Sequence, residues 1–112
     1  MLMPSGWWLV GAPMELRSGM DRLLVHVREH LDRDPMDGCA YVFRNRAATR
    51  IKVLCCDAQG TWLAVRRLQQ GRFIWPLAGA STWSLQADQF AWLCAGVDWR
   101  RLSAQKGLAQ RV

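Results

Sequence analysis

The stretch RIKVLCCDAQGTWLAVRR, residues 50–67, decides the fold. Its first half, Arg50–Cys56, alternates between apolar side chains at positions 51, 53 and 55 and basic side chains at positions 50 and 52, which is the period of a β-strand. Asp57–Gly60 has the composition of a tight hairpin loop, and Thr61–Arg67 follows as a returning strand. We therefore predict an antiparallel β-hairpin at the centre of the chain.

Further strands are expected on both sides of this hairpin. Cys39–Arg44 is rich in β-forming residues, and Arg72–Trp75 follows a Gly-containing turn and is closed by Pro76. A short strand is also expected near Trp7–Val10. Consecutive short strands with brief loops predict an antiparallel meander of three to four strands.

Helices are predicted before and after the strands. Apolar residues at positions 20, 23, 24, 27 and 31 form an amphipathic stripe, and Ser18 is the expected N-cap. A second helix is expected to open at Ser84 and to stop at Gly96. The predicted fold class is α+β, a small antiparallel β-meander flanked by an N-terminal and a C-terminal helix.

The length of 112 residues predicts a single domain, residues 1–112, with its core at about 8–102 and a flexible tail at 103–112. No apolar run approaches the ~20 residues that span a bilayer, and the first eleven residues fit a signal peptide poorly. We expect a cytoplasmic protein without membrane contact. The four cysteines show no metal-ligand spacing and are expected to be reduced.

The net charge of +6 lies in one segment. Between residues 44 and 72 there are seven basic residues and one acid, Asp57, while the rest of the chain is balanced. Such a segment predicts contact with nucleic acid, because Lys and Arg neutralise phosphates. The predicted nucleic-acid-binding residues are Arg44, Arg46, Arg50, Lys52, Arg66, Arg67 and Arg72.

Aromatic residues interleave with these charges and could stack on unpaired bases. They are Phe43, Trp62, Phe73 and Trp75. The alternative is a solvated sheet face beside a tryptophan-rich core. Arg66 and Arg67 are adjacent and would point to opposite faces of a strand, so the charges cannot all form one platform.

Catalytic motifs are not expected to operate here. His26-Val27-Arg28-Glu29-His30 has the spacing of an inverted zinc-peptidase helix, but no Glu follows Glu29 to act as a third ligand. Asp57, Asp88 and Asp98 each fit a turn or a helix end. We expect no enzyme activity, no cofactor and no metal.

Several ordered motifs resemble the small accessory protein, often called TnpB or the second open reading frame protein, of IS-sixty-six-type insertion sequences. That family typically reads FRNR, RIKVLWWD and KRLERGRFxWP, similar to residues 43–46, 50–57 and 66–76 here. Its GPTDMRKGFD, DPFSG and EGIDW resemble residues 12–21, 34–38 and 95–99. The Trp-Trp pair of the family is replaced by Cys55-Cys56.

The resemblance implies a non-catalytic accessory role in DNA transposition, beside a separate, larger DDE-type transposase. Our leading hypothesis is an accessory factor that contacts DNA through the basic hairpin segment. The alternative is a protein adaptor that binds the transposase without contacting DNA. In that case Trp62 and Trp75, together with Trp83, would form the partner-binding surface.

Overall fold

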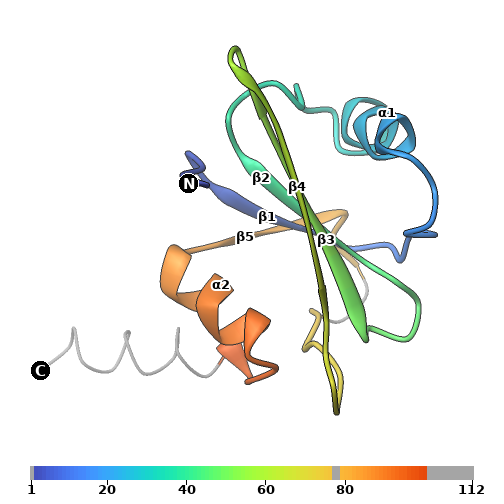
Figure 1. The fold of residues 1–112 in the computed structure, drawn as a ribbon, viewed down its shortest axis with the longest axis vertical. Coiled ribbons are helices and arrows are strands. Elements are labelled where there is room, and N and C mark those ends of the chain that lie inside the picture. Colours follow the sequence, from blue (N-terminus) through green and yellow to red (C-terminus); the bar gives the residue numbers. More distant parts are fainter. Residues whose placement is uncertain (1, 77–78, 101–112) are drawn as a thin grey trace, which may run out of the picture.

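In the part of the chain that the structure describes, five strands form one sheet, and two helices pack on its faces (Figure 1). The computed structural model describes residues 2–76 and 79–100, so the tail expected at 103–112 lies outside the described residues. The strands are β1 Trp7–Val10, β2 Ala40–Arg44, β3 Arg50–Asp57, β4 Gly60–Arg67 and β5 Thr82–Leu85, and the helices are α1 Met20–His30 and α2 Ala87–Cys94.

The α+β class is confirmed, but the predicted antiparallel meander is wrong, because the sheet is mixed. Its strand order is β4-β3-β2-β1-β5, and β1 pairs in parallel with β2. The chain leaves β1, crosses through α1 and returns to the sheet as β2, which is how parallel neighbours are joined. β5 then pairs antiparallel with β1.

The segment Arg72–Trp75 is not a strand, contrary to the prediction. Its polar groups bond elsewhere: the Phe73 N–H donates to the Ala48 carbonyl at 2.7 Å, and the Trp75 indole N–H donates to the Val10 carbonyl at 2.8 Å. The fifth strand is β5, part of which was predicted to open the second helix.

Both helices begin one or two residues later than their predicted caps. Gly19, not Ser18, is the N-cap of α1, and Gln86, not Ser84, is the N-cap of α2. Gln86 and Gln89 form a reciprocal capping box. Gly96 follows the α2 C-cap with a φ of 74°, which confirms the predicted stop.

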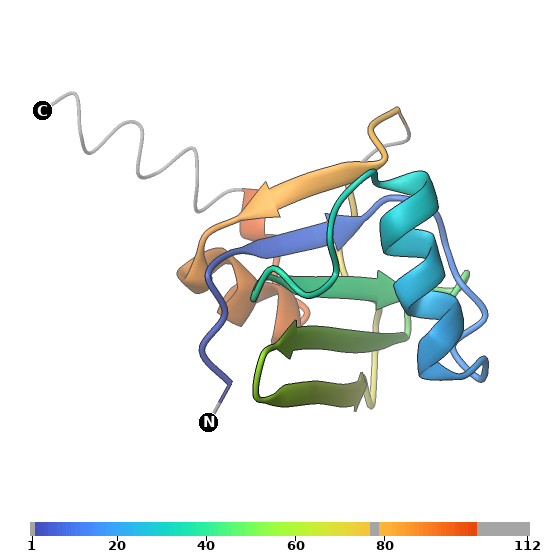
Figure 2. The ribbon, with the colours of Figure 1, turned by 90° about the horizontal axis from the view of Figure 1, so that it is seen from above.

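The alternation of side chains divides the core into two clusters, one on each face of the sheet. Figures 1 and 2 show α1 on one side of the sheet and α2 on the other. The α1 side buries Val10, Leu16, Leu23, Val27, Cys39, Tyr41, Phe43, Leu54 and Cys56. The α2 side buries Leu9, Ala40, Val42, Ile51, Val53, Cys55, Phe73, Leu85, Leu93 and Trp99.

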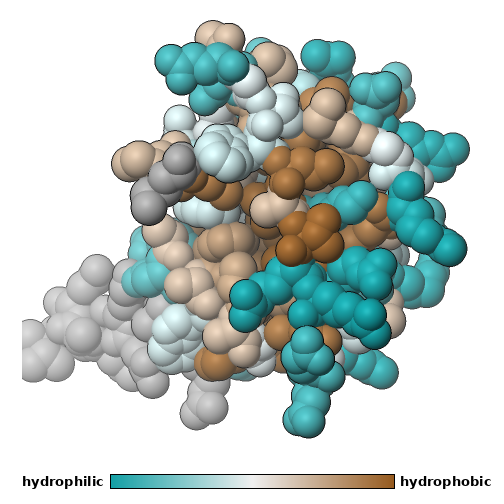
Figure 3. Space-filling view, in the orientation of Figure 1, coloured by the Kyte–Doolittle hydropathy of each residue, from teal (hydrophilic) through white to brown (hydrophobic). Residues whose placement is uncertain are grey.

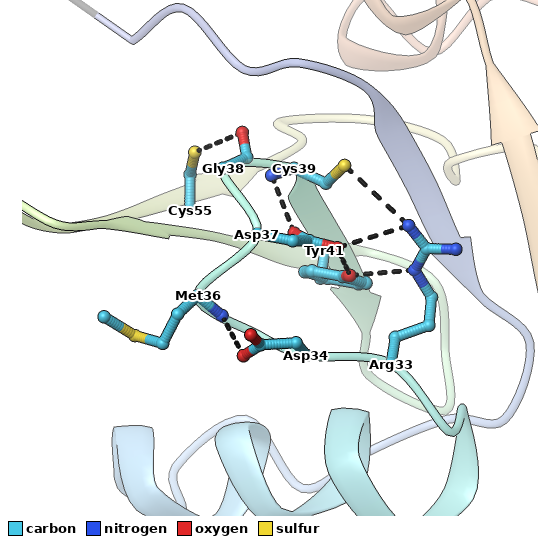
Figure 4. A network of polar contacts seen from close by, with 8 residues as sticks. All are labelled: Arg33, Asp34, Met36, Asp37, Gly38, Cys39, Tyr41 and Cys55. Carbon is cyan, nitrogen blue, oxygen red and sulfur yellow. Dashed lines mark hydrogen bonds and ion pairs between the residues drawn. The ribbon is translucent and has the colours of Figure 1, made fainter.

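Two aspartates shape the turn between α1 and β2 (Figure 4). Asp34 Oδ1 accepts the Met36 N–H and Asp37 Oδ1 accepts the Cys39 N–H, both at 2.9 Å. Gly38 follows Asp37 with a φ of 80°, and a Cβ there would lie 3.2 Å from the Ser5 hydroxyl. The turn therefore fixes where β2 begins.

No helix in the described part of the chain is long and apolar enough to cross a membrane.

Candidate nucleic-acid interface

Three basic side chains share one face of the β3–β4 hairpin. Arg50 stands directly opposite Arg67, and Lys52 stands opposite Val65. Because alternate residues of a strand point to the same face, Arg50, Lys52 and Arg67 lie together on the α1 side of the sheet. Like charges directly opposite each other destabilise an antiparallel pair, so Arg50 and Arg67 repel each other across the hairpin.

Arg66 lies on the other face of the hairpin. It stands opposite the buried Ile51, and its charge influences the pKa of the Cys94 thiol on α2. Burial raises the pKa of that thiol, and the nearby Arg66 partly offsets the shift. The expectation that Arg66 and Arg67 point to opposite faces is confirmed.

The loop that precedes β3 is closed by the Asn45 side chain. Its Oδ1 accepts the N–H groups of Thr49 at 2.9 Å and Arg50 at 3.1 Å, and its Nδ2 donates to the Thr49 hydroxyl. The carbonyl of Thr49 accepts the Leu68 N–H at 3.0 Å. These bonds hold the loop against the segment that follows β4, so Arg46 and Arg72 extend from adjoining loops at the same end of the hairpin.

A polar pocket of about 490 Å³ lies beside this end. Three arginines, Arg17, Arg46 and Arg50, are among its lining residues, and Glu15 is the one carboxylate among them. Figure 3 shows hydrophilic side chains gathered over the lower end of the hairpin and the loops next to it. The basic surface therefore continues from the sheet face into the pocket.

Glu15 is paired within this pocket. Its carboxylate accepts a hydrogen bond from the Arg17 side chain at 3.1 Å and one from the Arg17 N–H at 3.0 Å. The Arg17 hydrogen bonds and charge lower the pKa of Glu15, and the charge of Arg50 adds to the shift. Glu15 thus stays ionised and offsets one of the three arginine charges.

Arg44 is placed differently from the other predicted residues. It is half-buried, and its guanidinium donates to the Gly11 carbonyl at 3.2 Å and lies 5.7 Å from the centre of the Trp75 ring. Burial is the main cause that lowers its pKa, followed by the charge of Arg46. These contacts hold the segment after β1 against β2.

The aromatic residues do not form a stacking platform. Phe43 and Phe73 are buried in the two core clusters, and Trp75 packs against the core with its N–H bonded to Val10. Trp62 alone of the four is exposed, by 50%.

The two histidines of the zinc-like motif stack on each other, with ring centres 4.5 Å apart. His26 is half-buried, and burial followed by the charge of His30 lowers its pKa. Within residues 2–76 and 79–100, no three His, Cys, Asp or Glu side chains converge as a metal site would require.

The site also contains residues that sequence reasoning missed. Glu15 and Arg17 lie in the segment 12–21 that resembled a family motif, but they precede α1 and lie far from the basic segment in sequence. The family motif was the signal available in the sequence for these two residues. Local patterns could not place them in the site, because their position beside residues 45–50 depends on the tertiary fold.

One comparison with known proteins identifies a family, and another finds two relatives of similar sequence. The model of the family described as "IS66 Orf2 like protein" matches residues 5–104. The uncharacterized protein y4hO of Sinorhizobium fredii is 36% identical over 103 residues, which cover 88% of this chain and 90% of that protein. The uncharacterized protein y4jC of the same organism is 32% identical over 90 residues, covering 80% and 77%.

No solved structure matches the chain, so the family assignment rests on the sequence relationship. The match spans every described helix and strand, and the two relatives are covered over most of their length. The chain belongs to the IS66 Orf2-like family of transposition-associated accessory proteins.

Proposed function

We propose that the chain is a non-catalytic accessory factor that contacts the phosphate backbone of DNA during transposition of an insertion sequence. Its contact surface is the hairpin face of Arg50, Lys52 and Arg67, extended by Arg46, Arg72 and Arg17 at the same end. Its proposed partners are DNA and the separate DDE-type transposase of the same element.

The observation that carries this proposal is the cross-strand pair of Arg50 and Arg67. Two guanidinium groups held opposite each other repel, and Lys52 adds a third charge on the same face. A phosphate oxygen between them would reverse that repulsion, because charge-assisted hydrogen bonds from Arg to phosphate are strong and often bidentate.

Salt dependence of DNA binding tests the proposal. If about five phosphates are neutralised, the slope of log affinity against log salt should be near −4.5, and affinity should fall about 500-fold between about 50 and 200 mM salt. Replacing both Arg50 and Lys52 with Ala should flatten that slope by up to about two units and weaken binding equally across DNA sequences.

Arg67→Ala and Arg66→Ala form a matched pair, because the residues are neighbours of equal charge on opposite faces of β4. Arg67→Ala should weaken binding, whereas Arg66→Ala should weaken it less. Equal losses would contradict the assignment to one face. A folded wild type without salt-sensitive DNA binding, alone or with transposase, would overturn the proposal in favour of a protein adaptor.

One observation favours the adaptor alternative. A mainly apolar pocket of about 620 Å³ is lined by Pro76, Trp83, Leu85 and Trp99, among others, and Trp83 is exposed. Such a pocket suits an apolar anchor from a protein partner. Under this alternative, Trp83→Ala should reduce capture of the transposase while leaving DNA binding unchanged.

A further inference from the structure

β4 is an edge strand with an uncovered side. The sheet order places it outermost, next to β3, and all eight of its residues are exposed. Figure 2 shows it along the lower edge of the sheet. Edge strands are commonly protected by proline, bulges or inward-pointing charges. Residues 60–67 contain no proline, and the pairing with β3 is continuous from Asp57–Gly60 to Arg50–Arg67.

The side chains of β4 are apolar along its middle. Trp62 is 50% exposed, Leu63 42% and Val65 56%, and Figure 3 shows hydrophobic side chains over the middle of the strand. The charges are confined to its last two residues, Arg66 and Arg67. A long, regular, apolar edge is a template for pairing with another strand.

We propose that β4 pairs antiparallel with β4 of a second copy of this chain, about a two-fold axis at Ala64. A symmetric antiparallel pair has its axis perpendicular to the sheet, so each residue meets one of the same face. With the axis at Ala64, Leu63 stands opposite the partner's Val65, and Trp62 stands opposite the partner's Arg66. Thr61 stands opposite the partner's Arg67.

Charge and polarity favour this register over the symmetric ones displaced toward the arginines. An axis at Arg66 or Arg67 would place an arginine opposite itself, and like charges directly opposite destabilise the pair. An axis at Val65 would place Leu63 opposite an arginine. The axis at Ala64 pairs apolar with apolar on one face and guanidinium with indole on the other, which is a cation–π contact.

The resulting dimer would have one continuous sheet with both basic faces on the same side. Arg67 and the partner's Arg67 would be six residues apart along the strands, about 20 Å at the rise of a β-strand. This pairing is independent of the DNA contact proposed above, because it uses the free edge of β4 and needs no phosphate.

Sedimentation equilibrium in the absence of DNA tests the pairing. Each copy carries +6, so repulsion between copies opposes association and is screened by salt. The dimer should therefore strengthen between about 50 and 300 mM NaCl, the opposite of the expected DNA binding. A monomer throughout this range at about 0.5 mM protein would overturn the proposal.

Substitutions at Trp62 test the register. Trp62→Lys places a like charge opposite the partner's Arg66 and should weaken the dimer about tenfold, whereas Trp62→Glu places an opposite charge there and should retain it. Adding Arg66→Glu to Trp62→Lys should restore dimerisation. Equal weakening by the Lys and Glu variants would refute the register.

A cross-link provides a second measurement that does not depend on charge. Ala64→Cys should form an intermolecular disulfide on mild oxidation, because the two Cβ atoms would face each other at the axis. Ala58→Cys is the control, since Ala58 is also exposed but lies at the tip of the hairpin. Cross-linking of both variants at the same rate, or of neither, would count against the pairing. Loss of DNA binding in the arginine variants would not affect these results.

Discussion

Asp37 ties the start of β2 to the segment that follows α1. Its carboxylate accepts the Tyr41 hydroxyl at 2.7 Å and the Arg33 guanidinium at 3.2 Å, and the Arg33 Nε also donates to the Tyr41 oxygen at 2.9 Å. Figure 4 shows the three side chains converging. Arg33 also lies 4.2 Å from the centre of the Trp8 ring, so the network joins the turn to β1.

Asp37 should make folding stability sensitive to acid. Burial is the largest single influence and raises its pKa, but bonds from the Cys39 N–H and Tyr41 together with the charge of Arg33 outweigh it, and the net pKa is lowered. Because the pKa of Asp37 is lower in the folded state, its ionised carboxylate stabilises the fold at pH values above the ordinary pKa of an aspartate. This contribution is lost as the pH falls through the folded-state pKa.

The Asp37→Asn variant measures this contribution. It should be less stable than the wild type at pH 7, and the gap should narrow as the pH falls from about 5 toward 3, because the wild-type carboxylate becomes protonated. Urea unfolding of both proteins across this range gives the gap. Glu15→Gln is the control, since its exposed ion pair should change stability little. A constant gap would contradict the role of Asp37.

Charge alone did not predict the roles of single residues. Arg44 and Arg50 looked equivalent in the sequence, but Arg44 bonds to the Gly11 carbonyl, whereas Arg50 faces Arg67. Trp75 was a predicted partner contact, but its indole bonds to Val10. Both differences depend on segments distant in the sequence, which a local pattern cannot locate.

At the scale of elements, the local hairpin was predictable and the distant pairings were not. The alternation in Arg50–Cys56 and the turn at Asp57–Gly60 predicted β3 and β4 to within a residue or two. β1 was expected as a strand, but not between β2 and β5, and β5 was missed. A four-residue strand with non-local partners carries little periodic signal.

Repulsion between Arg50 and Arg67 should make the β3–β4 hairpin less stable than it would be with a neutral residue at position 67. Replacing Arg67 with Thr removes the repulsion from Arg50 and adds a β-branched residue, so we expect stability to rise by a few tenths to about 1 kcal/mol. DNA affinity should fall in the same variant. Urea unfolding measures the first effect, and titration at low salt measures the second.

Arg66→Thr is the control for this prediction, because Arg66 stands opposite Ile51 and relieves no direct cross-strand repulsion. It should stabilise the protein less than Arg67→Thr. If both variants stabilise equally, the gain comes from β-propensity alone. The cross-strand arginine pair would then carry no information about an anion.

For the whole molecule, the uneven distribution of charge should make folding stability depend on the salt concentration. The excess of +6 lies within residues 44–72, and the structure brings much of it to one end of the β3–β4 hairpin. Self-repulsion of this kind destabilises the folded state and is screened by salt. Folding and DNA binding should therefore respond to added NaCl in opposite directions.

Phosphate should stabilise the fold more than chloride at equal ionic strength. Screening is the same in both salts, but an oxyanion can bridge Arg50 and Arg67 with charge-assisted hydrogen bonds, and a ligand that binds the folded state raises the melting temperature. Phosphate also stabilises proteins generally by exclusion from their surface. The surplus, meaning the extra rise in melting temperature in phosphate over chloride, must therefore be compared between variants. Arg66→Ala should keep the whole surplus, and the double variant Arg50→Ala/Arg67→Ala should retain only the general part. Equal surpluses in the two variants would show that the hairpin face holds no anion, and the DNA contact would lose its main support.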